Sequence, residues 1–148
     1  MDIHDSLSAE HTQLRALVDQ LRAQRAKPSG ALEKILSDLK TLVRDHFARE
    51  EIYYRTVDQD KRFADRGFIH QLRNDHAALI FGMESLSIRL RNKGPIPEWW
   101  ERFEALMAVL LPHMDHEEKS LFPEAERLLS AEEWDAIRQA MARLTTES

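Results

Sequence analysis

Apolar side chains recur every three or four residues along most of this chain, which is the period of an amphipathic α-helix. Four such runs cover residues 7–21, 32–57, 69–90 and 99–121. The segments between them are polar or contain proline and glycine, which end helices and start turns. The pattern therefore predicts an all-α fold in which four long helices are joined by short loops.

A shorter helical segment follows the fourth run. Residues 130–133 read Ser-Ala-Glu-Glu, the sequence of a capping box at the start of a helix. The apolar positions after it are Trp134, Ile137, Met141 and Leu144. We expect an up-and-down four-helix bundle over residues 1–129 and a C-terminal helix over residues 130–148 that packs on it as a lid or brace.

Polar residues interrupt the apolar stripes at positions where the helical period calls for a core residue. These residues are His11, His46, Glu50, His76, His113 and Glu117. The second and fourth helices each carry the motif His-x-x-x-Glu, whereas the first and third each carry one histidine that follows an acidic residue. The two halves of the chain thus repeat one αα-hairpin with the same polar residues in the same places.

The His-x-x-x-Glu motif puts both side chains one helical turn apart on one face, where they can reach the same point. A single copy is typical of a surface ion pair, but two copies on core-facing stripes indicate a metal site. A rise of ~1.5 Å per residue places His11 and His46 about 9 and 11 Å from one end of the bundle. The same rise places His76 and His113 about 15 Å from that end. All six side chains can therefore share one layer of the core.

Composition restricts the ligands that such a site can use. The chain has no cysteine, so a metal ion would be held by nitrogen and oxygen atoms alone. Burying the imidazoles and carboxylates without partners is costly, and either a network of His-Glu hydrogen bonds or bound cations would have to offset that cost. We favour one or two metal ions, and the donor set suits iron, manganese or zinc.

The combined pattern resembles that of the hemerythrin-like (HHE cation-binding) proteins. The resemblance covers roughly residues 1–125 and rests on the blocks Glu10-His11, His46-Phe47-x-x-Glu50-Glu51, Asp75-His76 and Leu111-Pro112-His113-x-x-x-Glu117-Glu118-x-x-Leu121-Phe122-Pro123. It implies a four-helix bundle with a non-haem di-iron centre, so the cofactor would be two iron ions. The six polar residues named above would be the ligands, with Glu50 and Glu117 as bridging carboxylates.

The third helix departs from the pattern of the oxygen-carrying hemerythrins. Those proteins have a second histidine one turn before the third-helix ligand, where this chain has Leu72. His70 is the nearest substitute, but it lies about 120° around the helix from His76, so we expect it at the surface or in contact with a ligand only. The missing nitrogen leaves a coordination position for water, a tyrosine or a small molecule. The departure favours a sensor, scavenger or repair protein over a reversible oxygen carrier.

Two tyrosines follow the first predicted bridging glutamate. Tyr53 and Tyr54 stand three and four residues after Glu50, so either phenol could donate to a bridging carboxylate or bind a metal ion. We favour core packing with the hydroxyl at the rim. His4 and His116 are interpreted as bystanders.

Several acidic residues flank the predicted ligands. Glu118 is the alternative to Glu117 if a kink at Pro112 rotates the fourth helix. Glu10 and Asp75 are interpreted as solvated acids, and the alternative is a bond from each to an imidazole of the adjoining helix.

The charge and hydropathy of the chain argue against two classes of partner, nucleic acids and membranes. Lysine and arginine number 21 against 26 acidic residues, and the basic residues are scattered, which argues against a nucleic-acid partner. The longest apolar run, residues 105–111, is too short to cross a bilayer, and the N-terminal sequence lacks the features of a signal peptide. We therefore expect no membrane partner and a cytoplasmic location.

The sequence predicts a di-iron protein that binds or reacts with dioxygen, peroxide or nitric oxide, as a sensor, scavenger or iron-handling protein. The alternative is a binding module in which zinc or a single ion braces the bundle and the C-terminal helix contacts a protein partner. A homodimer is left open, and Trp99, Trp100 and Phe103 are interpreted as a packed aromatic plug that belongs to the core and could also form a dimer surface. An enzyme for an organic substrate has less support, because such di-iron sites carry Glu-x-x-His motifs in the opposite order.

Overall fold

The protein is described by a computed structural model that covers residues 2–64, 66–94 and 96–147. Its helices are α1 (Ile3–Ala26), α2 (Leu32–Asp58), α3 (Arg66–Arg91), α4 (Ile96–His116), α5 (Phe122–Leu128) and α6 (Ala131–Glu147), with a π-helical turn, η1 (Glu117–Leu121), between α4 and α5. All regular structure in the described ranges is helical, which confirms the predicted all-α class. None of the described helices has both the length and the apolar character of a membrane span.

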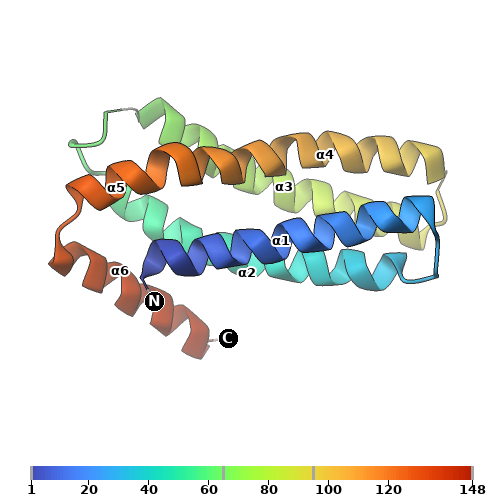
Figure 1. Ribbon diagram of the computed structural model, residues 1–148, viewed down its shortest axis with the longest axis horizontal. Helices are drawn as coiled ribbons and strands as arrows, with labels where there is room; N and C mark the ends of the chain where they lie inside the picture. The colour runs from blue at the N-terminus through green and yellow to red at the C-terminus, as the bar shows by residue number, and fades with distance from the viewer. Residues whose placement is uncertain (1, 65, 95, 148) are drawn as a thin grey trace.

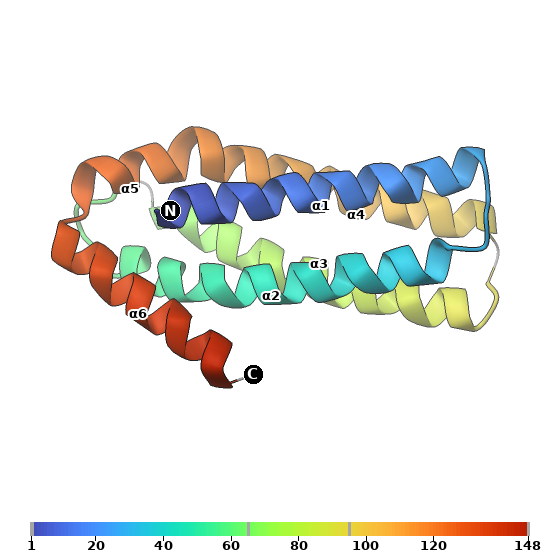
Figure 2. The same ribbon diagram turned by 60° about the horizontal axis from the view of Figure 1, so that its bottom comes forward.

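The first four helices form an up-and-down bundle, as predicted. Helices α1 to α4 lie side by side and alternate in direction (Figure 1), and each packs against the next along the chain. Arg22 of α1 and Glu104 of α4 form an ion pair at 2.9 Å, which links the first helix to the last. Helix α6 turns back across the end of the bundle and lies against α2 (Figure 2).

Two apolar clusters make up the core. The larger one lies toward the loops that follow α1 and α3 and includes Trp99, Trp100 and Phe103. The smaller one lies toward α6 and includes Leu7 and Leu72. Along each of the four long helices, the polar positions singled out in the sequence fall between residues of the one cluster and residues of the other. These polar positions therefore form one layer between the two apolar clusters.

The buried face of α2 is broader than the sequence pattern indicated. Leu36 and Val43 are buried, and Ile35 and Leu42, which lie at helical spacing in the predicted run 32–57, are half-buried. The reason is that α1 and α3 both pack against this helix, so its buried face extends to two sides.

Helix α6 begins with the predicted capping box. The Ser130 backbone N–H donates to Glu133 Oε1 at 2.9 Å, and the Glu133 backbone N–H donates to Ser130 Oγ at 3.2 Å. Arg62 holds the same carboxylate at 2.7 Å and donates to the Leu128 carbonyl at 2.7 Å. Ile137 is buried in the smaller cluster. These contacts fix α6 on the bundle, while the division of the chain at residue 130 stays a prediction.

Replacing the cap of α6 should destabilise the fold measurably. We expect Ser130→Ala to lower the free energy of unfolding by about 1 kcal/mol, because one backbone N–H of the first turn loses its acceptor. Chemical denaturation followed by circular dichroism measures this difference. Ser37→Ala, at an exposed position inside α2, is the matched control and should change the stability by a few tenths of that value at most. Equal losses in both variants would contradict the capping role.

Candidate metal centre

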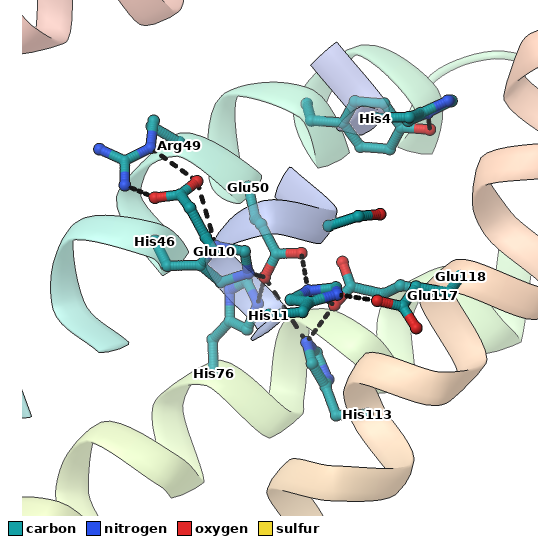
Figure 3. Close-up of polar contacts among 12 residues, drawn as sticks. His4, Glu10, His11, His46, Arg49, Glu50, His76, His113, Glu117 and Glu118 are labelled. Carbon is teal, nitrogen blue, oxygen red and sulfur yellow. Dashed lines mark hydrogen bonds and ion pairs between the residues drawn. The ribbon is translucent and has the colours of Figure 1, made fainter. Parts of the chain in front are cut away.

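The six polar residues of the apolar stripes meet in the middle layer of the bundle. They come from α1, α2, α3, α4 and η1, and their side chains converge in Figure 3. None of the six exposes more than 4% of its surface; they are His11, His46, Glu50, His76, His113 and Glu117. The helical period brings each residue to the core, and the up-and-down packing brings them to one level.

Glu50 lies at the centre of the layer. Its Oε1 is 3.2 Å from His46 Nε2 on the same helix and 3.1 Å from His76 Nε2 on α3. The same oxygen is 3.7 Å from His113 Nε2, and Oε2 is 3.9 Å from His11 Nε2. One carboxylate therefore faces imidazoles from all four helices.

Glu117 has the equivalent place in the second hairpin. Its Oε1 is 3.1 Å from His113 Nε2, one turn earlier, and 3.5 Å from His11 Nε2 on α1. Its Oε2 accepts the hydroxyl of Tyr54 at 2.7 Å. Each hairpin thus supplies a glutamate that faces the histidine of its own motif and a histidine from another helix.

The π-helical turn η1 sets the directions in which Glu117 and Glu118 point. Within η1, the backbone N–H of Phe122 donates to the carbonyl of Glu117, five residues back. Such turns widen the helix locally and occur frequently at functional sites. Here Glu117 is buried in the layer while Glu118 reaches α1. Pro112 lies inside α4, where the sequence predicted a kink, but the sequence did not predict the π turn that follows.

The outer nitrogen of each histidine faces a second acid from an adjoining helix. His11 Nδ1 donates to Glu118 Oε1 at 2.8 Å, and His46 Nδ1 is 3.3 Å from Glu10 Oε1. In the other half of the bundle the corresponding pairs are His113 Nδ1 with Asp75 Oδ2 at 3.1 Å and His76 Nδ1 with Glu51 Oε1 at 3.8 Å. Such carboxylates orient metal-binding imidazoles and make them more basic.

The interpretation of Glu10 and Asp75 as solvated acids is wrong. Their side chains expose only 13% and 17% of their surface, and each faces an imidazole of the next helix. Sequence spacing could not show this, because the contact depends on how far each helix is rotated toward its neighbour. Glu118, the alternative to Glu117, lies outside the layer, where its carboxylate accepts a hydrogen bond from His11 Nδ1.

Arginines hold three of these outer acids from the solvent side. Arg15 contacts Glu118 at 3.1 Å, Arg73 contacts Glu51 at 3.2 Å, and Arg49 forms an ion pair with Glu10. The fourth acid differs, because Asp75 accepts instead from the neutral amide of Gln71 at 3.0 Å. Nothing in the sequence indicates these partners, since arginine on an exposed helix face is ordinary and no spacing distinguishes these three arginines.

The geometry of the layer fits a bound cation. Because the Nδ1 nitrogens of His11 and His113 donate outward, their Nε2 nitrogens present lone pairs to the carboxylate oxygens. Six buried atoms of the layer have no hydrogen-bond partner among the described residues, namely His11 Nε2, both ring nitrogens of His46, Glu50 Oε2, His76 Nδ1 and Glu117 Oε1. Buried polar atoms in native proteins almost always find a partner. A cation in the layer would satisfy the four of these atoms that face inward, namely His11 Nε2, His46 Nε2, Glu50 Oε2 and Glu117 Oε1.

Two overlapping groups of ligand atoms are close enough to share an ion. One group contains His11, His46, Glu50 and Glu117, and the other contains Glu50, His76 and His113. Within each group the ligand atoms lie within 4.8 Å of one another. Glu50 belongs to both groups, which is the position of a bridging carboxylate. Glu117 joins only the first group.

The electrostatics keep the groups in the states that bind metals. Burial would raise the pKa of Glu50, but the surrounding imidazoles, His46 first, outweigh it and hold that pKa well below its usual range. Burial lowers the pKa of His76 despite the nearby Glu50 carboxylate. A charged carboxylate and a neutral imidazole are the forms that coordinate a metal ion.

The two tyrosines differ in what they contact. Tyr54 is fully buried. Its hydroxyl donates to Glu117 Oε2 and lies 3.4 Å from His113 Nε2. The expectation of a hydroxyl at the rim is therefore wrong for this residue. Tyr53 is also fully buried, but its hydroxyl lies 3.0 Å from His4 Nε2. His4 is therefore not a bystander in the structure.

Leu72 and His70, which the sequence also singled out on the third helix, do not contribute to the layer. Leu72, in the place of the missing fifth histidine, is buried in the smaller apolar cluster. His70 is exposed, and its Nε2 lies 2.7 Å from Asp58 Oδ1 at the surface, outside both groups of ligand atoms.

Comparison with known proteins gives one match. The family model described as the hemerythrin HHE cation binding domain matches residues 2–125. No curated protein and no solved structure matches the chain. The matched range contains all six residues of the buried layer and ends before α6.

Removing the shared carboxylate should abolish metal binding. We expect Glu50→Gln to take up no stoichiometric metal, because both groups of ligand atoms lose a charged oxygen. In the parent chain, metal at a hundredfold excess over its Kd should raise the stability by about 2.7 kcal/mol. Elemental analysis and thermal melts with and without chelator measure both effects. His70→Gln is the control and should bind as the parent does; an equal loss there would mean that the ligands are misassigned.

The outer acids should tune the affinity without supplying ligands. We expect Glu10→Gln to weaken metal binding about tenfold, because His46 loses a charged partner for its Nδ1. Competition against a chromophoric chelator measures the change in Kd. Glu101→Gln, at an exposed position of α4, is the matched control and should leave the Kd unchanged. An unchanged Kd in the Glu10 variant would contradict the orienting role.

Proposed function

Because the chain belongs to the hemerythrin HHE cation-binding domain family, we propose that its buried layer holds two iron ions and that this centre binds or reacts with dioxygen, peroxide or nitric oxide. The chain is a helical protein with buried His and Glu clusters able to hold metal. The proposal adds the identity and number of the metal ions and the nature of the reactant.

The observation that carries the proposal is the overlap of the two groups of ligand atoms. They share Glu50 and together use four imidazoles and two carboxylates. An all-imidazole and carboxylate donor set favours iron, zinc or manganese over metals that prefer sulfur. Four neutral nitrogens and two negative carboxylates suit a pair of divalent ions better than one, since a single ion would leave part of the layer unsatisfied.

The burial of the layer limits the reactant to a small molecule. None of the six residues exposes more than 4% of its surface, so an organic substrate of ordinary size could not reach them without opening the bundle. The centre also lacks the fifth imidazole of oxygen carriers, because Leu72 stands in that place. These features support a sensor, scavenger or iron-handling role rather than reversible oxygen carriage.

The chain's own residues would prepare the site for such chemistry. Iron, when bound, supplies one-electron redox changes and coordination positions open to a small ligand. The outer acids hold the imidazole rings in a fixed orientation. The Tyr54 hydroxyl donates to Glu117 Oε2 at 2.7 Å, at the edge of the layer. Burial raises the pKa of Tyr54 well above its usual value, so this phenol stays a donor.

Optical spectra of the iron-loaded protein test the proposal. We expect the anaerobically reduced protein to contain two iron ions per chain and to develop charge-transfer bands on exposure to air, peroxide or nitric oxide. His46→Ala should lose both the iron and the bands, whereas His70→Ala should keep them. A chain that takes up no iron would contradict the proposal. A redox-silent ion that raises the melting temperature without optical change would favour the alternative of a metal-braced binding module.

A further inference from the structure

A second polar group lies beside the buried layer, beneath α6. The Tyr53 hydroxyl is 3.0 Å from His4 Nε2, and His4 Nδ1 is 2.8 Å from Glu126 Oε1. Tyr53 and His4 are buried, whereas the Glu126 side chain is 56% exposed. The three residues therefore form a hydrogen-bonded row from the protein interior to solvent.

The direction of each hydrogen bond follows from the partners. A carboxylate only accepts, so His4 Nδ1–H donates to Glu126. A neutral imidazole then has a lone pair on Nε2, and this nitrogen accepts the Tyr53 O–H. Burial lowers the pKa of His4, although Glu126 opposes this shift, and the neutral ring is thereby favoured. Tyr53 thus has a base in direct contact with its phenolic proton.

Such a pair is suited to losing an electron and a proton together. A phenol becomes a strong acid once it is oxidised by one electron, so it needs an acceptor at hydrogen-bond distance. Transfer of the Tyr53 proton to His4 Nε2 would leave a neutral phenoxyl radical and an imidazolium ion. The Glu126 carboxylate, already bonded to the other ring nitrogen, would stabilise that imidazolium.

Aromatic rings connect this tyrosine to the buried layer and to the outside. The ring centroids of Tyr53 and Tyr54 are 6.1 Å apart, and Tyr54 donates to Glu117 of the layer. On the other side, the ring centroids of Tyr53 and Trp134 are 5.9 Å apart. Trp134 lies on α6 and is only partly buried. The rings of Tyr54, Tyr53 and Trp134 therefore form a path from the layer to the surface.

We propose that Tyr53 is a redox-active tyrosine that passes single electrons from the surface, through Trp134, to the metal centre, with His4 as the acceptor of its proton. The inference rests on the proposed function, because a centre that reacts with peroxide supplies the oxidant. Glu126 and Trp134 both lie beyond the range matched by the family model, so the path uses residues outside the family's common part.

The electrons and atoms balance with peroxide as the oxidant and a soluble one-electron reductant such as ascorbate as the donor. Reduction of one hydrogen peroxide to two waters breaks the O–O bond and takes up two electrons and two protons from solvent. Each electron that leaves Tyr53 for the centre sends its proton to His4 Nε2. The reductant returns the electron through Trp134, and the proton returns from His4 to the phenoxyl oxygen. Two such passages complete one turnover.

The sequence offers an unambiguous assignment of the radical, because Tyr53 and Tyr54 are the only tyrosines in the chain. In Tyr54→Phe, which keeps the ring of the path, any tyrosyl radical must belong to Tyr53. We expect freeze-quenched, iron-loaded Tyr54→Phe to show a tyrosyl signal by electron paramagnetic resonance after peroxide addition. Tyr53→Phe should not show the same signal.

The role of His4 is tested by His4→Gln in the Tyr54→Phe background. A glutamine oxygen still accepts the Tyr53 hydrogen bond but does not take up the proton, so a purely structural role is rescued. We expect radical formation to slow about a hundredfold, the lower end of what a positioned proton acceptor contributes. Equal rates in the two proteins would overturn the proposal.

The role of Trp134 is tested by the decay of the radical. In Trp134→Phe the radical should form as before but persist longer in ascorbate, because the electron from the surface has lost its entry point. Trp99→Phe is the matched control, since Trp99 is buried in the larger apolar cluster, away from Tyr53. Decay at the parent rate in Trp134→Phe would overturn the path.

Iron content and peroxide consumption are measured in parallel, to separate this inference from the proposed function. Peroxide consumption without a Tyr53 radical overturns the relay and leaves the proposed function intact; absence of iron uptake overturns both. The zinc-loaded chain, oxidised by a photogenerated ruthenium complex, gives a second readout without iron chemistry. There too, the Tyr53 radical should depend on His4, and a radical insensitive to His4→Gln would overturn the proposal.

Discussion

Four imidazoles and two carboxylates lie at one level of the bundle, enclosed between two apolar clusters. The lone pairs of buried nitrogen and oxygen atoms face one another there, and six buried atoms of the layer have no hydrogen-bond partner among the described residues. Burying such groups without partners is costly, and positive charge between the lone pairs would offset that cost. The repeated hairpins supply matched ligand atoms from opposite sides of the bundle, which suits a cation in this layer.

The acids around the layer link the helices in a ring. Going round the bundle, α1 supplies Glu10 to α2, α2 supplies Glu51 to α3, α3 supplies Asp75 to α4, and η1 supplies Glu118 to α1. Each helix thus orients a ligand of the next one, and three of the four acids are neutralised by arginine. Asp75 is the exception, because its outer partner is a neutral amide. The two halves of the site are therefore alike in geometry but unlike in charge.

The period of the apolar stripes was enough to predict the four helices and the six residues of the layer, because the helical repeat fixes which side chains face the core. It did not predict the outer acids or their arginines. Whether Glu10 meets solvent or His46 depends on the rotation of α1 against α2, and a single sequence carries no record of that angle. The π turn after Pro112 was not predicted from the sequence for a similar reason, since it is a local widening of the helix that no residue type requires.

Burial that protects a metal centre also isolates it. With no ligand side chain exposing more than 4% of its surface, the layer can exchange with solvent only small molecules, protons and electrons. Small molecules need transient openings, whereas protons and electrons need fixed hydrogen bonds and neighbouring rings. Those fixed features are gathered at one end of the bundle, beneath α6, where Tyr53 contacts both His4 and the ring of Trp134. Among the described residues, the buried polar side chains are His4 and the six of the layer, so none lies at the opposite end with Trp99, Trp100 and Phe103. A helix that only braces the bundle needs apolar contacts alone, so the hydrogen bond between the buried His4 imidazole and the Tyr53 phenol beneath α6 supports the proposed electron path at this end.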